Sequence, residues 1–469
     1  MKTALTEEAL GKAPIGRLLW KLAIPTILAQ FINMLYNLVD RIYIGHIAET
    51  GVTQLTALGV CTSLIISVSA FAYLVGSGGG PLSSIAAGKG KKEEAERIEG
   101  NSFILLIILG VILTTLLLIF SKPLLLAFGG SNETIGYAND YMQIYAIGTI
   151  FVMLTLGMNL FITAQGKTMT GMLSVLIGAI LNIALDPLFI FTFNMGVKGA
   201  AWATIISQGA SCIWVVTFLF SKRSEWQLKP CNFRLDLHLD SRIFALGSAT
   251  FLMQISEGIL TICFNTSLRK YGGDLAVGTM TILFSLTQLA FLPLSGLGQG
   301  AQPIISYNYG ANNKERVEAT FKLLLIVSLS FSAVFCSLIL GFPEPFARIF
   351  TNDATLLSHI TVPARIYVAC LTIFGIQIAC QQTFTAIGDA VSSLMAAIMR
   401  KFILLIPLIY ICPAIWTSNQ EYAVYLAEPI ADFLAVSFTS VLFFFKFRGA
   451  MKKMDEKKEN EPTSVMTVQ

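Results

Sequence analysis

The chain has 469 residues, of which 55% are hydrophobic and only 13% are charged, and its formal net charge is +4. A soluble protein of this size needs more polar surface than this composition supplies, so the chain belongs in a lipid bilayer. The basic residues lie mainly in loops and in the tail, where they orient the chain and contact anionic lipid headgroups, so nucleic-acid binding is not implied.

Long apolar windows follow one another along the whole chain. Twelve of them are long enough to cross the hydrocarbon core, which takes about 20 residues. They lie near residues 17–44, 53–80, 98–120, 137–162, 168–193, 197–220, 241–269, 273–302, 316–341, 356–385, 391–412 and 421–446. The sequence therefore predicts an all-α integral membrane protein with twelve transmembrane helices.

The second and eighth windows end in related sequences. Residues 78–90, GGGPLSSIAAGKG, reappear in outline as residues 298–310, GQGAQPIISYNYG, and Pro187 reappears as Pro407. The chain is thus two copies of a unit with six spans. Because six is even, both copies cross the membrane in the same sense and are parallel repeats.

The positions of Lys and Arg predict which segments lie outside the bilayer. Most of them occur in the first segment, in the loops after even-numbered windows and in the tail, so both termini of this multi-pass protein should be cytoplasmic. The predicted organisation is a cytoplasmic segment at 1–16, an N-terminal six-helix bundle at 17–220, a cytoplasmic linker at 221–240, a C-terminal six-helix bundle at 241–446 and a cytoplasmic tail at 447–469. The charged composition of the tail predicts disorder.

A stripe of polar side chains runs along the first window. Its members are three and four residues apart, which places them on one helical face: Gln30, Asn33, Asn37 and Asp40. Asp40 directly precedes Arg41, so an interfacial ion pair is the alternative to a functional role for this acid.

The seventh window repeats this face with Gln254, Glu257 and Thr261. Glu257 stands where the first copy has Asn33, and no basic residue is near it in the sequence. An ionisable side chain at membrane depth is costly and usually faces a cavity or a partner. Glu257 is therefore a candidate for the substrate cavity, with a structural role as the alternative.

The fifth window contains another acid of the first copy. Asn182 and Asp186 are four residues apart on one face, and Pro187 frees backbone carbonyls directly after them. Together with Asp40 and Thr204 they offer the oxygen ligands that a small hard cation prefers, or carboxylates that share a proton. A capping or salt-bridged structural acid is the plainer interpretation of Asp186.

Further side chains are candidates for the wall of a substrate cavity. Besides Gln30, Asn33, Asn37 and Gln254 of the polar faces above, they are Met34, Met158, Gln377 and Gln381. Plain packing is the alternative for the Met residues, and interhelical hydrogen bonding is the alternative for Gln377 and Gln381. Arg400 allows three interpretations: snorkelling to the cytoplasmic surface, pairing with an acid, or contact with substrate.

Several strings in fixed order carry a family resemblance. They are LAIPTILAQFINMLYNLVDRIYIG in the first window, GSGGGPLSSIAAGKGKKEEA after the second, and NIALDPLFIF with GVKGAAWATIISQ around the fifth and sixth. With the two parallel halves, the chain resembles the multidrug and toxic compound extrusion (MATE) transporters over essentially its whole length. It is most similar to the DinF-like branch, which includes multidrug exporters of the MepA type.

The resemblance implies two V-shaped bundles around a central cavity that opens alternately to each side. It implies export of cationic or amphipathic drugs in exchange for H⁺ or Na⁺, with a cation site at Asp40, Asn182, Asp186 and Thr204. Pro25 matches a proline at which the first helix is thought to bend.

One feature of the NorM-like branch is matched only in part. Glu257 matches an acid of that branch, but the companion acid is missing, because no Asp or Glu lies between Arg365 and Gly388. The resemblance therefore does not carry a NorM-type cation site in the second half. It implies no cofactor beyond the coupling ion, no nucleic acid, and a monomer in the bilayer.

Two other functions remain as alternatives. A flippase for lipid-linked sugars would need a cationic cavity for its anionic cargo, and the spans contain few basic residues apart from Arg400 and Lys401. An intramembrane enzyme would need a nucleophile with a base or a metal cluster, and the three histidines show no ligand spacing. The eight cysteines are scattered and predict neither disulfides nor a metal site.

Overall fold

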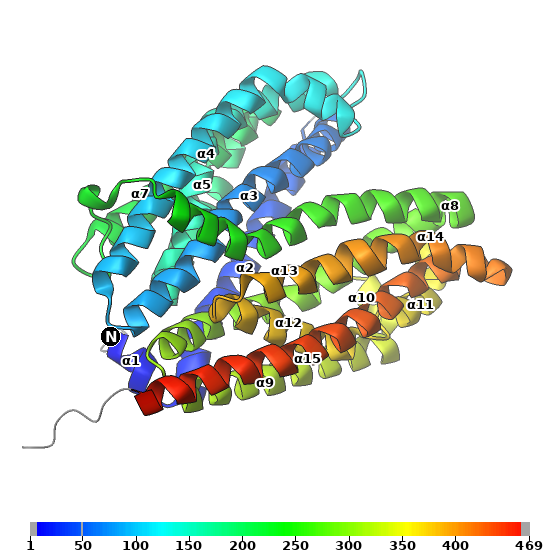
Figure 1. The fold of residues 1–469 in the computed structure, drawn as a ribbon. Helices are drawn as coiled ribbons and strands as arrows, with labels where there is room; N and C mark the ends of the chain where they lie inside the picture. The colour runs from blue at the N-terminus through cyan, green and yellow to red at the C-terminus, as the bar shows by residue number, and fades with distance from the viewer. Residues whose placement is uncertain (1–6, 48–49, 461–469) are drawn as a thin grey trace, which may run out of the picture.

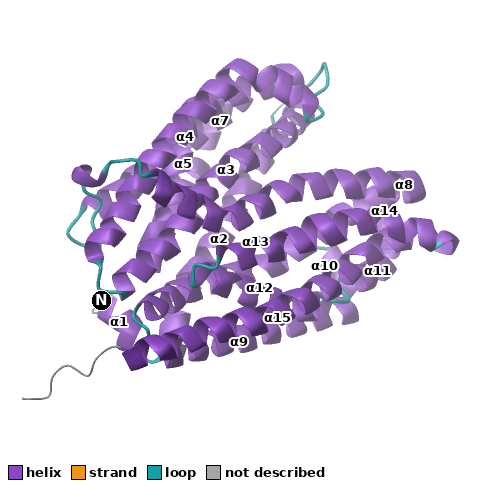
Figure 2. Ribbon diagram, viewed as in Figure 1, coloured by secondary structure: helices purple, strands orange, loops and turns teal. Residues whose placement is uncertain are grey.

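In the computed structural model, which describes residues 7–47 and 50–460, the chain folds into two helical bundles arranged as a V (Figure 1). Within these residues all regular structure is helical (Figure 2). The first half contains α1 (Glu7–Lys12), α2 (Ile15–Gly45), α3 (Gly51–Gly88), α4 (Lys92–Ala127), α5 (Ile135–Ala164), α6 (Thr168–Pro187), the π-helical η1 (Leu188–Thr192) and α7 (Val197–Phe220).

The short 3₁₀ turn η2 (Pro230–Asn232) lies in the linker between the two halves. The second half contains α8 (Leu237–Gly310), α9 (Lys314–Gly341), α10 (Pro343–Ala347), α11 (Ala354–Tyr367), α12 (Leu371–Ala386), α13 (Ala390–Ile398), the π-helical η3 (Met399–Leu405), α14 (Ile406–Ile415), the 3₁₀ turn η4 (Thr417–Asn419) and α15 (Gln420–Asn460).

The predicted spans agree with these helices. In the described part of the chain, ten helical segments are long and apolar enough to cross a membrane, and the pair α11 and α12, bent by 50°, forms an eleventh span. The 74-residue α8 contains two spans, because Gly273 breaks it with a φ of 67°. A positive φ of this kind strains residues with a Cβ, so glycine suits the break. The prediction of a twelve-span, all-α membrane protein is confirmed.

The first membrane span of each half, α2 and the start of α8, begins in the core of the other bundle. Leu19 and Leu22 of α2 pack with Ala301 of the second half, whereas Ile243 and Leu246 of α8 are buried in the N-terminal core. These helices therefore connect the bundles mechanically. The predicted bundles at 17–220 and 241–446 are divided by sequence position. In space, the first residues of each range pack in the core of the other bundle.

Glycines allow close contact at the end of the V where α1 and the last turns of α15 lie (Figure 1), which we name the closed end. A Cβ at Gly78 of α3 would overlap the carbonyl of Ile243, and a Cβ at Gly310 of α8 would overlap that of Ile85. Both glycines belong to the repeated sequence, so the duplicated motif seals this end. The bundles diverge toward the opposite, open end.

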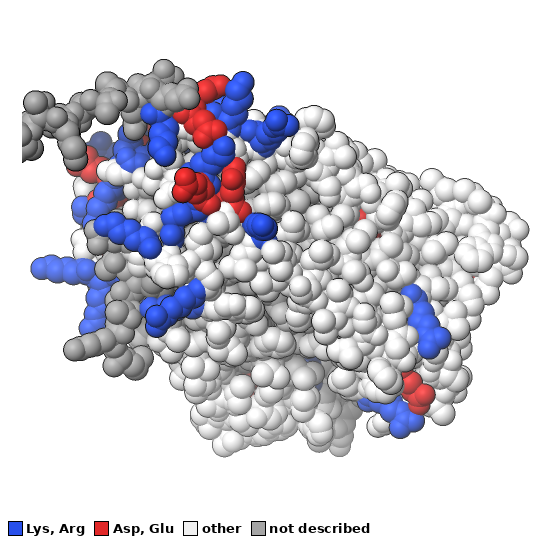
Figure 3. All heavy atoms as spheres, turned by 90° about the horizontal axis from the view of Figure 1, so that it is seen from below, with Lys and Arg blue, Asp and Glu red and all other residues white. Residues whose placement is uncertain are grey.

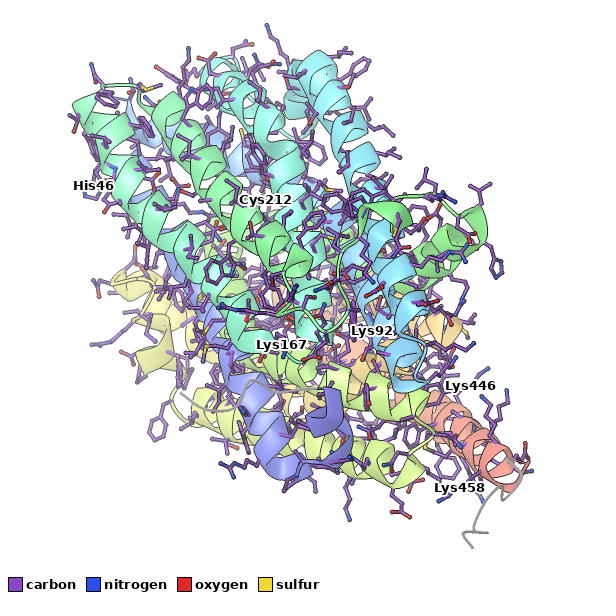
Figure 4. All side chains as sticks on the ribbon, turned by 90° about the vertical axis from the view of Figure 1, so that its left-hand side faces the viewer. His46, Lys92, Lys167, Cys212, Lys446 and Lys458 are labelled. Atoms are coloured by element: carbon purple, nitrogen blue, oxygen red, sulfur yellow. The ribbon has the colours of Figure 1, made fainter. Side chains whose placement is uncertain are left out.

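On the face seen in Figure 3, charged side chains gather at the two ends, most of them at the closed end, with a broad uncharged surface between. Viewed from the closed end, Lys92 and Lys167 lie on the N-terminal bundle and Lys446 on α15 (Figure 4). The linker is held there by Lys229, whose Nζ donates a 2.6 Å hydrogen bond to Glu96. This bond raises the pKa of Lys229 above its ordinary value.

The predicted disorder of the tail is wrong for residues 447–460, where α15 continues as a helix. Met451 and Met454 bury one face of this segment against the closed end, and Lys452 lies 3.8 Å from Glu456 on the exposed face. Composition alone predicted disorder because it does not show that the apolar and the charged residues lie on opposite faces of a helix.

Candidate functional site

A cavity of about 310 Å³ lies between the bundles. Gln30, predicted for a cavity wall, lines its N-terminal side, and Gln254, Glu257 and Gln381 line its C-terminal side. All charged side chains on the wall come from the C-terminal bundle: Glu257, Arg400, Lys401 and Glu428. The cavity is therefore asymmetric in charge: the C-terminal side carries ionic and amide groups, whereas the N-terminal side carries polar groups without charge, such as Gln30 and Ser77.

Ion pairs connect the charged residues of the C-terminal wall. The Lys401 Nζ donates to Glu257 Oε1 at 2.8 Å, and Arg400 donates to Asp432 Oδ1 at 2.7 Å and to Glu428 Oε1 at 3.0 Å. Together these residues form a five-member cluster, named the C-terminal ionic cluster below. It contains three carboxylates and two cationic groups.

The π-helical segment η3 positions both bases of this cluster. Arg400 and Lys401 lie in its first turn, and both are buried. A π-turn accommodates an extra residue and so rotates neighbouring side chains relative to an α-helix. The Arg400 guanidinium also lies over the ring of Phe374, 4.6 Å from its centre, which favours its charged form.

A second polar cluster lies inside the N-terminal bundle. The Asn182 Nδ2 donates to Asp186 Oδ1 at 3.3 Å, and Asp40 is close enough to Asp186 to interact with it electrostatically. Thr204 lines the same small cavity as Asn182, and Tyr141 lies close enough to Asp40 to interact with it electrostatically. The structure thus brings together the four residues of the predicted cation site, here named the N-terminal cluster.

Three oxygen atoms of the N-terminal cluster are buried without a hydrogen-bond partner among the described residues: Asp40 Oδ1, Asn182 Oδ1 and Asp186 Oδ2. Asp186 is fully buried and Asn182 and Asp40 are 2% and 9% exposed. Buried oxygens of this kind are costly unless a proton or cation satisfies them. The donor set, two carboxylates with an amide and a hydroxyl, fits either a proton or a small hard cation.

Local sequence explains how α6 and α7 hold this cluster. Pro187 ends α6 without a backbone donor, and the chain continues as the π-helical η1. Gln54 of α3 accepts a 2.7 Å hydrogen bond from the backbone N–H of Val197, which fixes the start of α7. Thr204 lies two turns further along this helix.

A comparison with known protein families identifies the chain. The family model MatE matches residues 25–188 and 249–411, which are the two halves of the duplication. The chain belongs to the MatE family. The predicted resemblance to MATE transporters is thereby confirmed.

Relatives and solved structures agree with the MatE assignment. The chain is 24% identical over 426 residues to the "Multidrug export protein MepA" of Staphylococcus haemolyticus, covering 91% of this chain and 93% of that protein. It is 26% identical over 430 residues to the protein of the same name from Staphylococcus aureus strain NCTC 8325, with the same coverage.

Two solved structures show the same fold. A MATE protein in a bent conformation superposes with a TM-score of 0.90 at 23% identity, covering 97% of this chain and 100% of that one. A multidrug resistance MATE family transporter in an outward-facing conformation gives a TM-score of 0.88 at 23% identity, covering 96% and 100%. This MatE protein is therefore a multi-pass membrane protein by fold and a transporter by family.

Some predicted wall residues lie elsewhere in this MatE protein. Met158 is fully buried in the N-terminal core and Gln377 is 1% exposed, so their assignment to the cavity wall is wrong. Both lie on helix faces that pack against neighbouring helices, which periodicity alone does not distinguish from a cavity face. Met34 is half-buried on α2.

The remaining positions on α2 differ from one another. Asn33 lines small cavities inside the N-terminal bundle, and the exposed Asn37 donates a 2.7 Å hydrogen bond to the Asn33 carbonyl. Helix α2 continues through Pro25, so its role as a hinge stays a prediction. Arg41 is exposed and forms no ion pair within 4.0 Å of Asp40 among the described side chains.

Sequence reasoning missed two sets of residues. Tyr36 and Tyr141 pack near Asp40, which no spacing rule predicted. Glu428 and Asp432 were also missed, although they are four residues apart on one face of the last span. That spacing in an apolar helix was a usable signal, because buried acids require partners. Of the three interpretations of Arg400, the structure shows pairing with acids.

Proposed function

We propose that this MatE protein exports hydrophobic, cationic compounds across the cell membrane in exchange for H⁺ or Na⁺. The observation that carries the proposal is the separation of two acidic sites: Glu257 on the central cavity, and the buried pair Asp40 and Asp186 inside the N-terminal bundle. The relatives named multidrug export proteins support the drug as cargo.

The N-terminal cluster suits the coupling ion. Its unpartnered oxygens suit a proton or Na⁺, whereas the cavity beside Asn182 and Thr204, of about 40 Å³, is too small for a drug. A buried carboxyl is readily protonated, and a bound cation favours its charged form, so ion and proton compete there. Binding of the ion changes the packing between α2 and α6, and α2 also contacts the C-terminal bundle. Through α2, ion binding is therefore coupled to the relative orientation of the two bundles.

The distribution of charge supports an outward-open state. The closed end carries most of the Lys and Arg side chains (Figure 3), which is the signature of a cytoplasmic surface. The cavity then faces the exterior, and both termini are cytoplasmic. Loading from the cytoplasm requires the contacts between α3 and α8 at the closed end to separate, with Pro25 of α2 as the proposed hinge.

A flippase for anionic lipid-linked sugars fits the cavity less well. Its two basic groups, Arg400 and Lys401, are both paired with acids. The surplus carboxylate leaves the wall negative rather than positive. This charge balance favours cationic cargo. We propose that a single polypeptide in the bilayer carries out the transport.

Transport of a fluorescent cationic dye in proteoliposomes tests this function. We expect a proton or a sodium gradient, imposed separately, to drive dye efflux by the intact protein, and Asp186→Asn to abolish it. Asp140→Asn is the matched control, because Asp140 pairs with Lys198 on the surface and is 44% exposed. Dye movement under neither gradient, together with lipid scrambling in the same vesicles, would replace the exchanger by a flippase.

A further inference from the structure

The pair formed by Glu257 and Lys401 is unequal in its exposure. Glu257 of α8 is 41% exposed on the cavity wall, whereas Lys401 of η3 is only 7% exposed behind it. Their side chains meet at 2.8 Å. A ligand in the cavity therefore reaches the carboxylate from the open side, while the lysine reaches it from inside the bundle.

Lys401 forms a salt bridge with one acid of the C-terminal ionic cluster, whereas Arg400 forms salt bridges with the other two. Arg400 already binds Glu428 and Asp432 and lies over Phe374, so these two acids have a cation of their own. Among the described residues, Glu257 is the one acid that lies within 4.0 Å of the Lys401 Nζ. A second cation at Glu257 therefore competes with the lysine for the charge of this carboxylate.

The surroundings of Glu257 suit a flat organic cation. The cavity wall beside it contains Phe284, Phe291, Tyr367 and Phe374, whose ring faces attract positive charge and apolar surface. The cluster has one carboxylate more than it has cations. A bound monovalent cation therefore balances the charge of the wall.

We propose that Lys401 is a tethered cation that competes with the positive charge of the transported compound for the Glu257 carboxylate, and that this competition releases the compound toward the open end. The inference rests on the proposed export of cationic compounds. In the open state the Lys401–Glu257 pair is formed, so the affinity of the cavity for a cation is low. A low affinity on the side of release favours export.

Equilibrium binding of ethidium, a cationic aromatic dye, to the purified full-length protein in detergent tests the proposal. Lys401→Gln removes the competitor, and we expect it to bind ethidium at least about tenfold more tightly than the unmodified protein, because close charge pairs couple by about 1.5 kcal/mol or more. Lys401→Arg, which keeps the charge, is expected to bind more weakly than Lys401→Gln.

A double-mutant cycle identifies Glu257 as the shared partner. The gain from Lys401→Gln is expected to disappear when Glu257→Gln is present. Lys198→Gln, at the exposed pair with Asp140, is the control expected to leave binding unchanged. Nile red, which is uncharged, is expected to bind all variants alike, and thermal unfolding checks that each variant is folded.

Two results would overturn the proposal: no gain in ethidium affinity for folded Lys401→Gln, or a gain that persists with Glu257→Gln. Because binding is measured without an ion gradient, these results are independent of efflux. If gradient-driven efflux failed, the proposed ion exchange would be wrong, but the competition at Glu257 could still be shown by binding. If the binding cycle failed, the competition would be wrong and the ion exchange would be unaffected.

Discussion

The two halves of this chain share a fold and differ in where they place charge. At the closed end the duplication is preserved, since glycines of both copies make the contacts between α3 and α8. At the N-terminal cluster it is not: the second copy has Phe264 where the first has Asp40, and Ile406 where the first has Asp186. Phe264 is fully buried and packs against Phe284 at 5.7 Å. The acidic pocket of one half is thus hydrophobic core in the other.

The π-helical segments of the two halves also differ in position. In the first half η1 follows Pro187, whereas in the second half η3 precedes Pro407. An extra residue in a helical turn rotates the side chains by about 100°. Arg400 and Lys401 consequently face the interior, while Ile180, at the position of Arg400, is 57% exposed toward lipid. The two halves thus share one fold. Their different local helix geometry places an acidic pocket inside the first half and charged side chains on the cavity wall of the second.

The largest expected effect is a loss of transport when an acid of the N-terminal cluster is replaced, compared with the same position in the second half. Asp40→Asn leaves one carboxylate where two are needed, and we expect gradient-driven dye efflux to fall to the level of empty vesicles. Phe264→Leu changes the corresponding position of the second half and is expected to retain efflux within about twofold, because it alters only packing. Efflux assays in proteoliposomes compare the two. Loss in the Phe264 variant with retention in the Asp40 variant would reverse the assignment.

A second effect concerns the C-terminal ionic cluster. Arg400→Met leaves Glu428 and Asp432 buried without a cation, which is expected to cost about 3–5 kcal/mol of stability. Arg269→Met breaks the exposed pair with Asp274 and is expected to cost less than about 1 kcal/mol. Chemical unfolding in detergent measures both variants. If Arg400→Met and Arg269→Met lost the same stability, Glu428 and Asp432 would not be buried as unpaired charges without Arg400.

The third effect tests the close contact between α3 and α8 at the closed end. In Gly247→Ala the new Cβ would overlap the carbonyl of Leu74, so the closed end must separate at a cost of about 1–3 kcal/mol. Gly258→Ala, in the same helix, meets no atom within 4 Å and is the control. Distances between spin labels across the closed end should lengthen only in the Gly247 variant. An unchanged distance distribution there would contradict the glycine seal.

The smallest effect concerns a residue that the sequence assigned to the cavity. Met158→Leu replaces a fully buried side chain by one of similar volume, and we expect a change below about 1.5 kcal/mol in stability. The set of transported dyes should not change, which a panel of dyes in the efflux assay would check. A shifted set of dyes would place Met158 in contact with substrate.

The sequence predicted the spans, the duplication and the common face of Asn182 and Asp186 because these features depend on local spacing, whereas the family resemblance added Asp40 and Thr204 from other helices. Asn182 and Asp186 are one helical turn apart, so their common face follows from the 3.6-residue period. It did not predict the pairing of Lys401 with Glu257, which depends on a π-turn and on contact between residues 144 positions apart. It also did not predict that α2 begins in the opposite core, since hydropathy describes burial without naming the neighbour.

The division of labour between the two halves is tested most directly by measuring dye binding and gradient-driven efflux in Asp186→Asn and Glu257→Gln side by side. We expect Asp186→Asn to bind dye and lose the response to the gradient, and Glu257→Gln to bind cationic dye more weakly while its remaining efflux still follows the gradient. The opposite pattern, with the gradient response lost in Glu257→Gln and kept in Asp186→Asn, would contradict the account.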